Sequence, residues 1–204
     1  LNISIREGAL IEIKGVQELD LISKVVAYEV ARQLELVRMR DELASRGVKA
    51  TELADKFVKV SELLTQTDSN LVRKALASGG IGLAVKLQGF HGLLGRELAP
   101  GLRLGTEMAS RATFWGGVGG IFHTDELPAY GISEGEVQSI KQMLGCRELD
   151  AAVLVADFED KARDALTAVV ERAREALLGV PSETRMATED GTTRYMRPRP
   201  GASR

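Results

Sequence analysis

The density of glycine between Lys86 and Ile132 limits the fold of this chain more than any other feature. Residues 86–109 read K-L-Q-G-F-H-G-L-L-G-R-E-L-A-P-G-L-R-L-G-T-E-M-A, and residues 116–132 read G-G-V-G-G-I-F-H-T-D-E-L-P-A-Y-G-I. Glycine loses more conformational entropy on folding than other residues, so this density is typical of positions with special backbone angles or close approach by another segment. The pattern predicts two ordered loops, each joined to a cluster of charged residues.

Hydrophobic periodicity around these loops predicts alternating strands and helices. Alternation of apolar and polar residues predicts a β-hairpin over 2–14, and apolar residues at helical spacing predict a long helix from Glu18 to Ser45. The apolar residues that recur at helical spacing in it are Ile22, Val26, Val30, Leu34 and Val37. Further strands are expected at 56–60, 81–87, 118–122 and 151–155, and helices at 71–77, 106–114, 133–145 and 157–178, before a second hairpin that turns at Asp190-Gly191. Ser133 and Glu136 predict a capping box at the start of the helix at 133–145. Asp157 is expected to cap the last helix, whose predicted apolar stripe is Ala162, Leu166, Val169, Ala173 and Leu177. The alternation of strands with helices along the chain, taken alone, favours an α/β layer in which helices cover a sheet.

Composition excludes several classes of protein. A chain of 204 residues with 44% apolar and 27% charged residues holds one domain, or one domain and part of another. The net charge of −2 excludes a globally basic nucleic-acid binder but leaves room for a local basic patch. The single cysteine, Cys146, excludes an internal disulfide and a multi-cysteine zinc site. No apolar run approaches the ~20 residues of a membrane helix and no signal peptide is present, so a cytoplasmic protein with no membrane partner is expected. Leu1 in place of a start methionine and the loop-like last residues suggest a piece cut from a longer protein.

The loop at 89–105 has two interpretations. Its backbone N–H groups and the side chains of Arg96 and Arg103 suit a phosphate oxyanion, although no G-K-[ST] sequence follows. The favoured alternative is an ordered loop in which Arg96 pairs with Glu97, and Arg103 pairs with Glu107.

His123, Asp125 and Glu126 have side chains of the kind that bind metals. At a strand exit, however, residues one and two positions apart point to different faces. A structural loop cluster, or a surface that contacts the neighbouring domain, is therefore favoured and no metal site is predicted. Phe114 and Trp115 follow the helix pattern and are expected in the core, and Cys146 is expected to be a buried or incidental thiol.

Polar residues near each end are candidates for binding. Glu12 and Lys14 alternate with isoleucines and share a strand face, and Asn2, Ser4 and Arg6 alternate in the same way; solvated and ligand-facing interpretations stay equally open. Near the other end, no acidic residue follows Asp190. The arginines of this run are Arg194, Arg197, Arg199 and Arg204. Together with Tyr195 they suit RNA phosphates and a stacked base, although scattered arginines are usually only solvated.

Both ends of the chain resemble segments of known amidotransferase subunits. Residues 2–17, N-I-S-I-R-E-G-A-L-I-E-I-K-G-V-Q, are similar to a segment shared by the archaeal glutamyl-tRNA(Gln) amidotransferase subunit GatE and its bacterial counterpart. Residues 182–197, S-E-T-R-M-A-T-E-D-G-T-T-R-Y-M-R, are similar to another segment that these two families share.

The block between the two ends resembles the insertion domain common to GatE and bacterial-type aspartyl-tRNA synthetases. The strings at 93–107 and 122–132 are similar to the GatE version in particular. Leu102 stands where an arginine is usual in that family, which weakens the case for an anion site in the loop.

The resemblance implies an α+β fold. Residues 1–44 would be a cradle-domain segment with a hairpin and a long helix, 45–179 the synthetase-like insertion with a mostly antiparallel sheet, and 180–204 the return to the cradle domain. Residues 2–14 are expected to pack with residues 183–196 as one unit. It also places Glu12, Lys14 and Arg6 in the cradle as possible nucleotide- or substrate-facing positions. Arg194, Arg197, Arg199, Arg96 and Arg103 are possible tRNA contacts.

The same resemblance implies what the whole protein does. GatE activates glutamate on mischarged tRNA(Gln) with ATP and Mg²⁺, and ammonia from the glutaminase/asparaginase-like amidotransferase subunit GatD completes the amide, within a heteromer. The family's metal ligands lie upstream of Leu1, so no catalytic residue is expected here and the chain alone is expected to be inactive. The alternatives are a non-catalytic module that binds tRNA or a partner protein, and a fragment of an aspartyl-tRNA synthetase; the second leaves both flanking segments unexplained.

Overall fold

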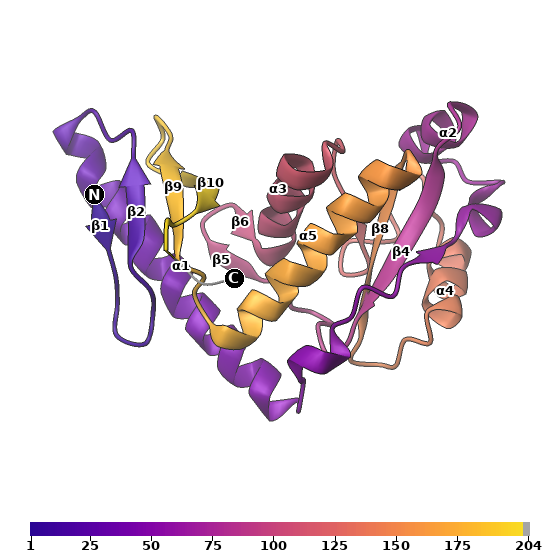
Figure 1. The fold of residues 1–204 in the computed structure, drawn as a ribbon, viewed down its shortest axis with the longest axis horizontal. Helices are drawn as coiled ribbons and strands as arrows, with labels where there is room; N and C mark the ends of the chain where they lie inside the picture. The colour runs from indigo at the N-terminus through magenta and orange to yellow at the C-terminus, as the bar shows by residue number, and fades with distance from the viewer. Residues whose placement is uncertain (202–204) are drawn as a thin grey trace.

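Both ends of the chain build one sheet. A computed structural model describes residues 1–201, and in it β1 (Asn2–Ile3), β2 (Ile11–Lys14), β9 (Glu183–Ala187) and β10 (Thr193–Pro198) form a sheet in the order β1-β2-β9-β10. We call it the terminal sheet (Figure 1). Its two hairpins are antiparallel, as predicted, while β2 and β9 pair in parallel with Glu12 opposite Thr184. The expected packing of residues 2–14 against 183–196 is therefore confirmed.

A second sheet lies in the middle of the chain. It contains β3 (Val58–Lys59), β4 (Ile81–Leu87), β8 (Ala151–Asp157) and β7 (Phe122–His123) in the order β3-β4-β8-β7, and every neighbouring pair is antiparallel. We call it the middle sheet. The α+β prediction is confirmed, and the α/β layer suggested by alternation alone is wrong. Helices between strands in sequence do not fix strand direction when the loops return the chain to the opposite end of the sheet.

Helices cover both faces of the middle sheet. Successive strand residues point to opposite sides, so Leu83 and Val85 join a cluster with Leu166 of α5 (Glu159–Leu178), whereas Ala84 joins one with Val137 of α4 (Glu134–Met143). α2 (Asn70–Ala77) lies on the same side as α4. The predicted capping box opens α4: Ser133 Oγ accepts from the Glu136 N–H at 3.2 Å, and Glu136 Oε1 accepts from the Ser133 N–H at 2.9 Å.

Two further helices connect the sheets. α3 (Leu104–Gly116) packs on α5 so closely that a Cβ on Gly116 would lie 2.7 Å from Ala165. α1 (Leu19–Ser45) runs beside the terminal sheet and on toward α5 (Figure 1). The short elements are the 3₁₀ turns Ala50–Glu52 and Ser61–Leu64 and the ribbon of β5 (Glu97–Ala99) with β6 (Leu102–Arg103).

The buried face of α1 differs from the predicted one. Val26 and Leu34 of the predicted stripe are 37% and 43% exposed. The residues that α1 buries are Val25, Tyr28, Glu29, Arg32, Gln33, Leu36, Met39 and Leu43. A pattern of apolar letters alone selects the wrong face here, because the buried face includes charged side chains that are paired inside the protein.

The start of α5 also differs from the prediction. Asp157 is the last residue of β8, and the N-cap position of the helix is Phe158. The predicted apolar stripe of α5 is confirmed, since Ala162, Leu166, Val169 and Ala173 are fully buried and Leu177 is half-buried against the same core.

The later half of α1 joins the main core. Leu36, Met39 and Leu43 belong to the same cluster as the strands of the middle sheet and α5. The domain boundaries at 44/45 and 179/180 therefore stay a prediction. Within residues 1–201, none of the helices combines the length and hydropathy of a membrane-spanning segment.

Candidate functional site

One face of the terminal sheet gathers candidates from both ends of the chain. Ile11 and Ile13 are buried on the side of α1, so Glu12 and Lys14 point to the opposite side, which we call the outer face. Lys14 pairs with Met186, which pairs with Arg194; Glu12 pairs with Thr184, which pairs with Arg197. Directly opposed residues project to the same side, so Lys14, Arg194 and Arg197 share the outer face with one carboxylate, Glu12.

The Glu12 carboxylate has a partner on this face. Its Oε2 accepts a hydrogen bond from Thr184 Oγ1 at 3.1 Å. With three cationic side chains and one carboxylate among these four residues, the outer face is a local basic patch on a chain whose net charge is −2.

Arg6 and Arg199 are not brought into this face by strand pairing. β1 ends at Ile3, so the predicted alternation does not extend to Arg6, which is exposed in the turn before β2. Arg199 follows β10, is half-buried, and donates its backbone N–H to the Ser182 carbonyl at 3.2 Å. Arg204 lies outside the described residues.

The predicted ion pairs of the loop at 89–105 are wrong. Arg96 pairs with Glu42 of α1 at 2.5 Å, and the Glu97 carboxylate accepts the Gly101 N–H at 3.0 Å. Glu107 pairs with arginines from α1 and α5 rather than with Arg103. Sequence proximity suggested the partners, but the loop folds against elements that are distant in sequence.

Carboxylates take the positions that a bound phosphate would need in this loop. The Asp125 carboxylate accepts the N–H groups of Gly92 and Gly95 at 2.9 and 3.0 Å, and Asp150 accepts that of Gly89 at 2.9 Å. These backbone donors already have internal anionic partners, which favours the ordered-loop interpretation.

The histidine cluster has structural contacts as well. His123 Nε2 lies 3.5 Å from Glu126 Oε2, and burial lowers the pKa of His123 despite the nearby carboxylates. Within residues 1–201, no three His, Cys, Asp or Glu side chains are arranged to hold a metal ion. Burial raises the pKa of the half-buried Cys146 to about 11, which leaves its thiol protonated near neutral pH.

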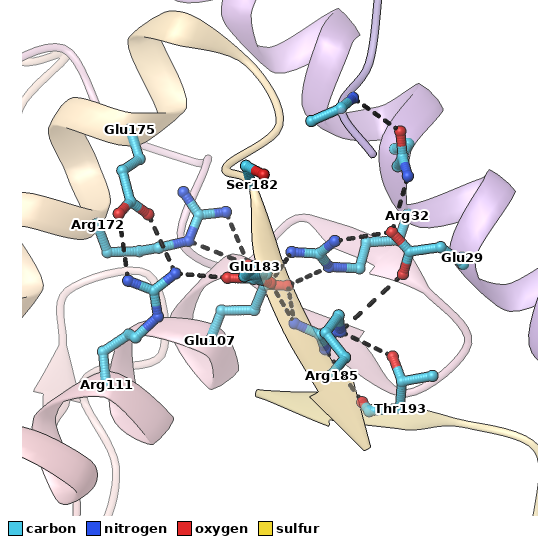
Figure 2. Close-up of polar contacts among 12 residues, drawn as sticks. Glu29, Arg32, Glu107, Arg111, Arg172, Glu175, Ser182, Glu183, Arg185 and Thr193 are labelled. Atoms are coloured by element: carbon cyan, nitrogen blue, oxygen red, sulfur yellow. Dashed lines mark hydrogen bonds and ion pairs between the residues drawn. The ribbon is translucent and has the colours of Figure 1, made fainter. Parts of the chain in front are cut away.

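Behind the terminal sheet lies a set of paired charges that the sequence did not reveal. Figure 2 shows four carboxylates and four guanidiniums from α1, α3, α5 and β9 that meet between these elements. We call it the buried charge network. Its members are Glu29, Arg32, Glu107, Arg111, Arg172, Glu175, Glu183 and Arg185.

Arg32 is the centre of this network. It is fully buried, and its three nitrogens donate to Glu107 at 2.5 Å, Glu183 at 2.7 Å and Glu29 at 3.1 Å. Burial by itself would lower the pKa of Arg32, but the carboxylates outweigh it and raise that pKa. Burial would likewise raise the pKa of Glu107, but Arg32, Arg172 and Arg185 outweigh burial and hold it well below its usual range.

The remaining ion pairs attach β9 to the helices. Glu183 accepts from Arg111 of α3 at 2.7 Å and from its strand neighbour Arg185 at 2.7 Å, and Arg185 also donates to the Thr193 hydroxyl of β10 at 2.8 Å. Arg172 of α5 donates to Glu107 at 2.7 Å. The network therefore fixes β9 and β10 relative to the three helices (Figure 2).

An open cavity of about 100 Å³ lies where β10 meets α3. Its lining residues include Thr106, Ser110, Arg111, Arg194 and Tyr195. Leu102 also lines this cavity, and the predicted tRNA contact Arg103 is the next residue in the sequence.

The core assignment of Phe114 and Trp115 is wrong. They are 54% and 46% exposed, respectively, at the end of α3. The Phe114 ring meets the Tyr195 ring edge-on, with centroids 5.7 Å apart. A helical pattern locates the residues on α3 but does not say whether another element covers that part of the helix.

A weak sequence signal for the buried charge network exists. In the strand Glu183–Ala187, Glu183 and Arg185 occupy alternate positions and share a face, as charged residues on a solvated face would. The E-T-R string matches a family pattern, but the sequence alone does not indicate which charges pair with it.

Comparison with known proteins decides the family. The model of the GAD domain matches residues 72–166. Over the whole chain, the sequence is 54% identical to the GatE subunit of glutamyl-tRNA(Gln) amidotransferase from Methanocaldococcus jannaschii, 53% identical to that of Thermococcus gammatolerans and 52% identical to that of Methanococcus vannielii. The chain belongs to the GatE family. It spans about a third of the length of these curated relatives, 32% in each case.

The GAD match covers a defined part of this GatE segment. It runs from α2 through β4, β7 and β8 of the middle sheet to the first half of α5. The outer face and all of α1 lie outside the match, so the candidate RNA-facing positions on the terminal sheet are not part of the GAD domain.

Proposed function

We propose that this chain acts as part of an archaeal glutamyl-tRNA(Gln) amidotransferase, which converts Glu-tRNA(Gln) to Gln-tRNA(Gln). The supporting observation is the 50–54% identity to proteins named as GatE subunits, which extends over all of the chain. The word subunit in that name fits a heteromeric enzyme, and the partner proposed is the glutaminase/asparaginase-like subunit GatD.

The reaction requires activation of a carboxylate. A carboxylate is a poor acyl donor until one of its oxygens becomes a phosphate leaving group, so ATP with Mg²⁺ is the proposed activating pair and ammonia the nucleophile that displaces the phosphate. The residues described here do not fit a Mg²⁺ site by themselves, because Glu12 is the single carboxylate among the paired outer-face positions and has Thr184 as its neighbour. No step of the reaction is therefore assigned to this chain.

The proposed contribution of the chain is to hold RNA and to support the catalytic part of the enzyme. On this proposal the chain alone does not hydrolyse ATP, and Mg²⁺-dependent ATP turnover by the purified chain above background would overturn it. Lys14, Arg194 and Arg197 lie on one face and suit the phosphates of tRNA, because each phosphate neutralised by a cationic side chain releases a counterion.

Charge removal in the complete enzyme tests the RNA role. Arg194→Ala and Arg197→Ala should each weaken tRNA binding and reduce the slope of log K against log salt by about one unit, because both side chains lie exposed on the outer face. Arg73→Ala is the matched control, because it removes the same charge from an exposed position on α2, far from β10 (Figure 1). Unchanged affinity and slope in both test variants would assign these arginines a structural or solvated role.

A further inference from the structure

Three aromatic side chains gather at the surface where α3 ends beside β10. Phe114 and Trp115 meet at a centroid distance of 5.0 Å with their planes 76° apart, and Phe114 meets Tyr195 at 5.7 Å and 85°. We call these three residues the aromatic cluster. Phe114 and Trp115 are each about half exposed, and two large rings in contact with each other form an apolar surface that another molecule can cover.

The charges around this cluster are cationic on the side of β10. The Arg111 guanidinium lies 4.0 Å above the centre of the Tyr195 ring, a cation–π contact. Its charge is compensated by Glu175 and Glu183. Arg194 and Arg197 lie on the same strand as Tyr195 but project to the outer face, opposite the Tyr195 ring. β10 is the edge strand of the terminal sheet, and within residues 1–201 neither arginine side chain forms an ion pair.

The cavity adds a second recognition element beside the rings. Tyr195 belongs both to the aromatic cluster and to the cavity lining, where the hydroxyl-bearing residues Thr106 and Ser110 lie with Arg194. Flat rings, hydroxyl groups and guanidiniums within one small area match the three parts of a nucleotide, which are base, ribose and phosphate.

We propose that the aromatic cluster stacks an unpaired base of the bound RNA at the edge of the terminal sheet, while Arg194, which projects from the same edge strand to the outer face, contacts a phosphate of a neighbouring nucleotide. The charge around the rings favours RNA over a protein partner, because a cationic strand suits a polyanion. This inference rests on the proposed function and assigns its RNA contact to residues outside the strings at 93–107 and 122–132 that resemble GatE most specifically.

Fluorescence gives a direct readout, since Trp115 is the only tryptophan among the 204 residues. Titration of the chain with an unpaired oligonucleotide, such as oligo(A) RNA, should quench Trp115, whereas an RNA duplex of equal charge should quench it much less. Quenching by both to the same extent would point to charge alone and overturn the stacking proposal.

Variants in the complete enzyme extend the test to tRNA. Stacking on one ring is worth about 1–3 kcal/mol, so Trp115→Ala should weaken tRNA binding by about 5- to 150-fold. Trp115→Phe, which keeps a ring, should recover most of that loss, which separates stacking from misfolding. Phe158→Ala is the control, because Phe158 is also about half exposed but is no member of the cluster.

The outcomes separate this inference from the proposed function. If Trp115→Ala leaves tRNA affinity unchanged while Arg197→Ala weakens it, the stacking site is wrong and the RNA role stands. If Trp115→Ala instead weakens only the association with the other subunits, the cluster is a protein-docking surface and the stacking site is again wrong.

Discussion

The two sheets of this molecule are stabilised by different chemistry. The middle sheet has hydrocarbon on both faces, with Leu83 and Val85 against α5 and Ala84 against α4. The terminal sheet has hydrocarbon mainly under β1 and β2, whereas β9 contacts α1 and α3 through the side chains of Glu183 and Arg185, and α5 joins through the pair of Arg172 with Glu107. Burial of hydrocarbon is non-directional, while hydrogen-bonded ion pairs require one geometry.

This difference assigns the two regions different roles. The attraction within a buried ion pair is largely offset by the free-energy cost of removing both charges from water. Buried ion pairs therefore add little net stability compared with well-packed apolar side chains. We infer that the buried charge network specifies where β9 and β10 lie, and with them the outer face and Tyr195, while the middle sheet supplies most of the stability.

Removal of one carboxylate from the network should have the largest effect on stability. Glu107→Gln leaves Arg32 and Arg172 buried without their shared anion, and breaking a buried pair in this way costs about 3–5 kcal/mol. The contrasting variant Leu83→Met keeps side-chain volume in the middle sheet and should cost less than about 1.5 kcal/mol.

Urea unfolding of both variants measures these costs. Glu97→Gln, at an exposed position of β5, is the charge-matched control and should leave the unfolding midpoint nearly unchanged. A cost for Glu107→Gln no larger than that of Leu83→Met would remove the distinction between the two regions.

Acid should weaken the terminal sheet before the middle sheet. Burial would raise the pKa values of Glu107 and Glu183, but the nearby arginines outweigh burial and lower both. A lowered folded-state pKa means that the stabilisation is fully present above the unfolded-state pKa of about 4.3 and is lost as pH falls from there through the folded-state pKa. Hydrogen exchange below about pH 4 should show β9 opening ahead of β4 and β8, and the same protection at both sites would contradict this.

Sequence patterns predicted the helices and strands better than they predicted which segments pack against them. The hairpins, the capping box at Ser133 and the apolar stripe of α5 follow from local spacing and are confirmed. The antiparallel direction of the middle sheet came from the resemblance, because local spacing carries no information on strand direction.

The errors share one physical cause. The buried face of α1, the partners of Arg96 and Glu107, and the exposure of Trp115 all depend on which distant segment lies opposite. A charged residue is normally predicted to be solvated. The presence of Arg32 on one face of α1 therefore favoured the opposite face as the buried one, which is wrong. Strand alternation alone puts Glu12 and Lys14 on one face of their strand, so these two residues could be predicted. Their proximity to Arg194 depends on the long-range pairing of β2 with β9, which local patterns do not indicate.

The parallel pairing of β2 with β9 also bears on how the chain folds. Glu12 and Thr184 are 172 residues apart, and closing a flexible loop of that length costs on the order of 4–5 kcal/mol beyond a constant term. Once α1 and α5 have packed in the shared core, only residues 15–18 and 179–182 separate the helices from these two strands. Most of the loop entropy is then already lost, so pairing β2 with β9 requires only a small further loss of entropy. Synthesis of the chain also places β9 after both helices, which agrees with a folding order in which the terminal sheet closes after the helices have packed.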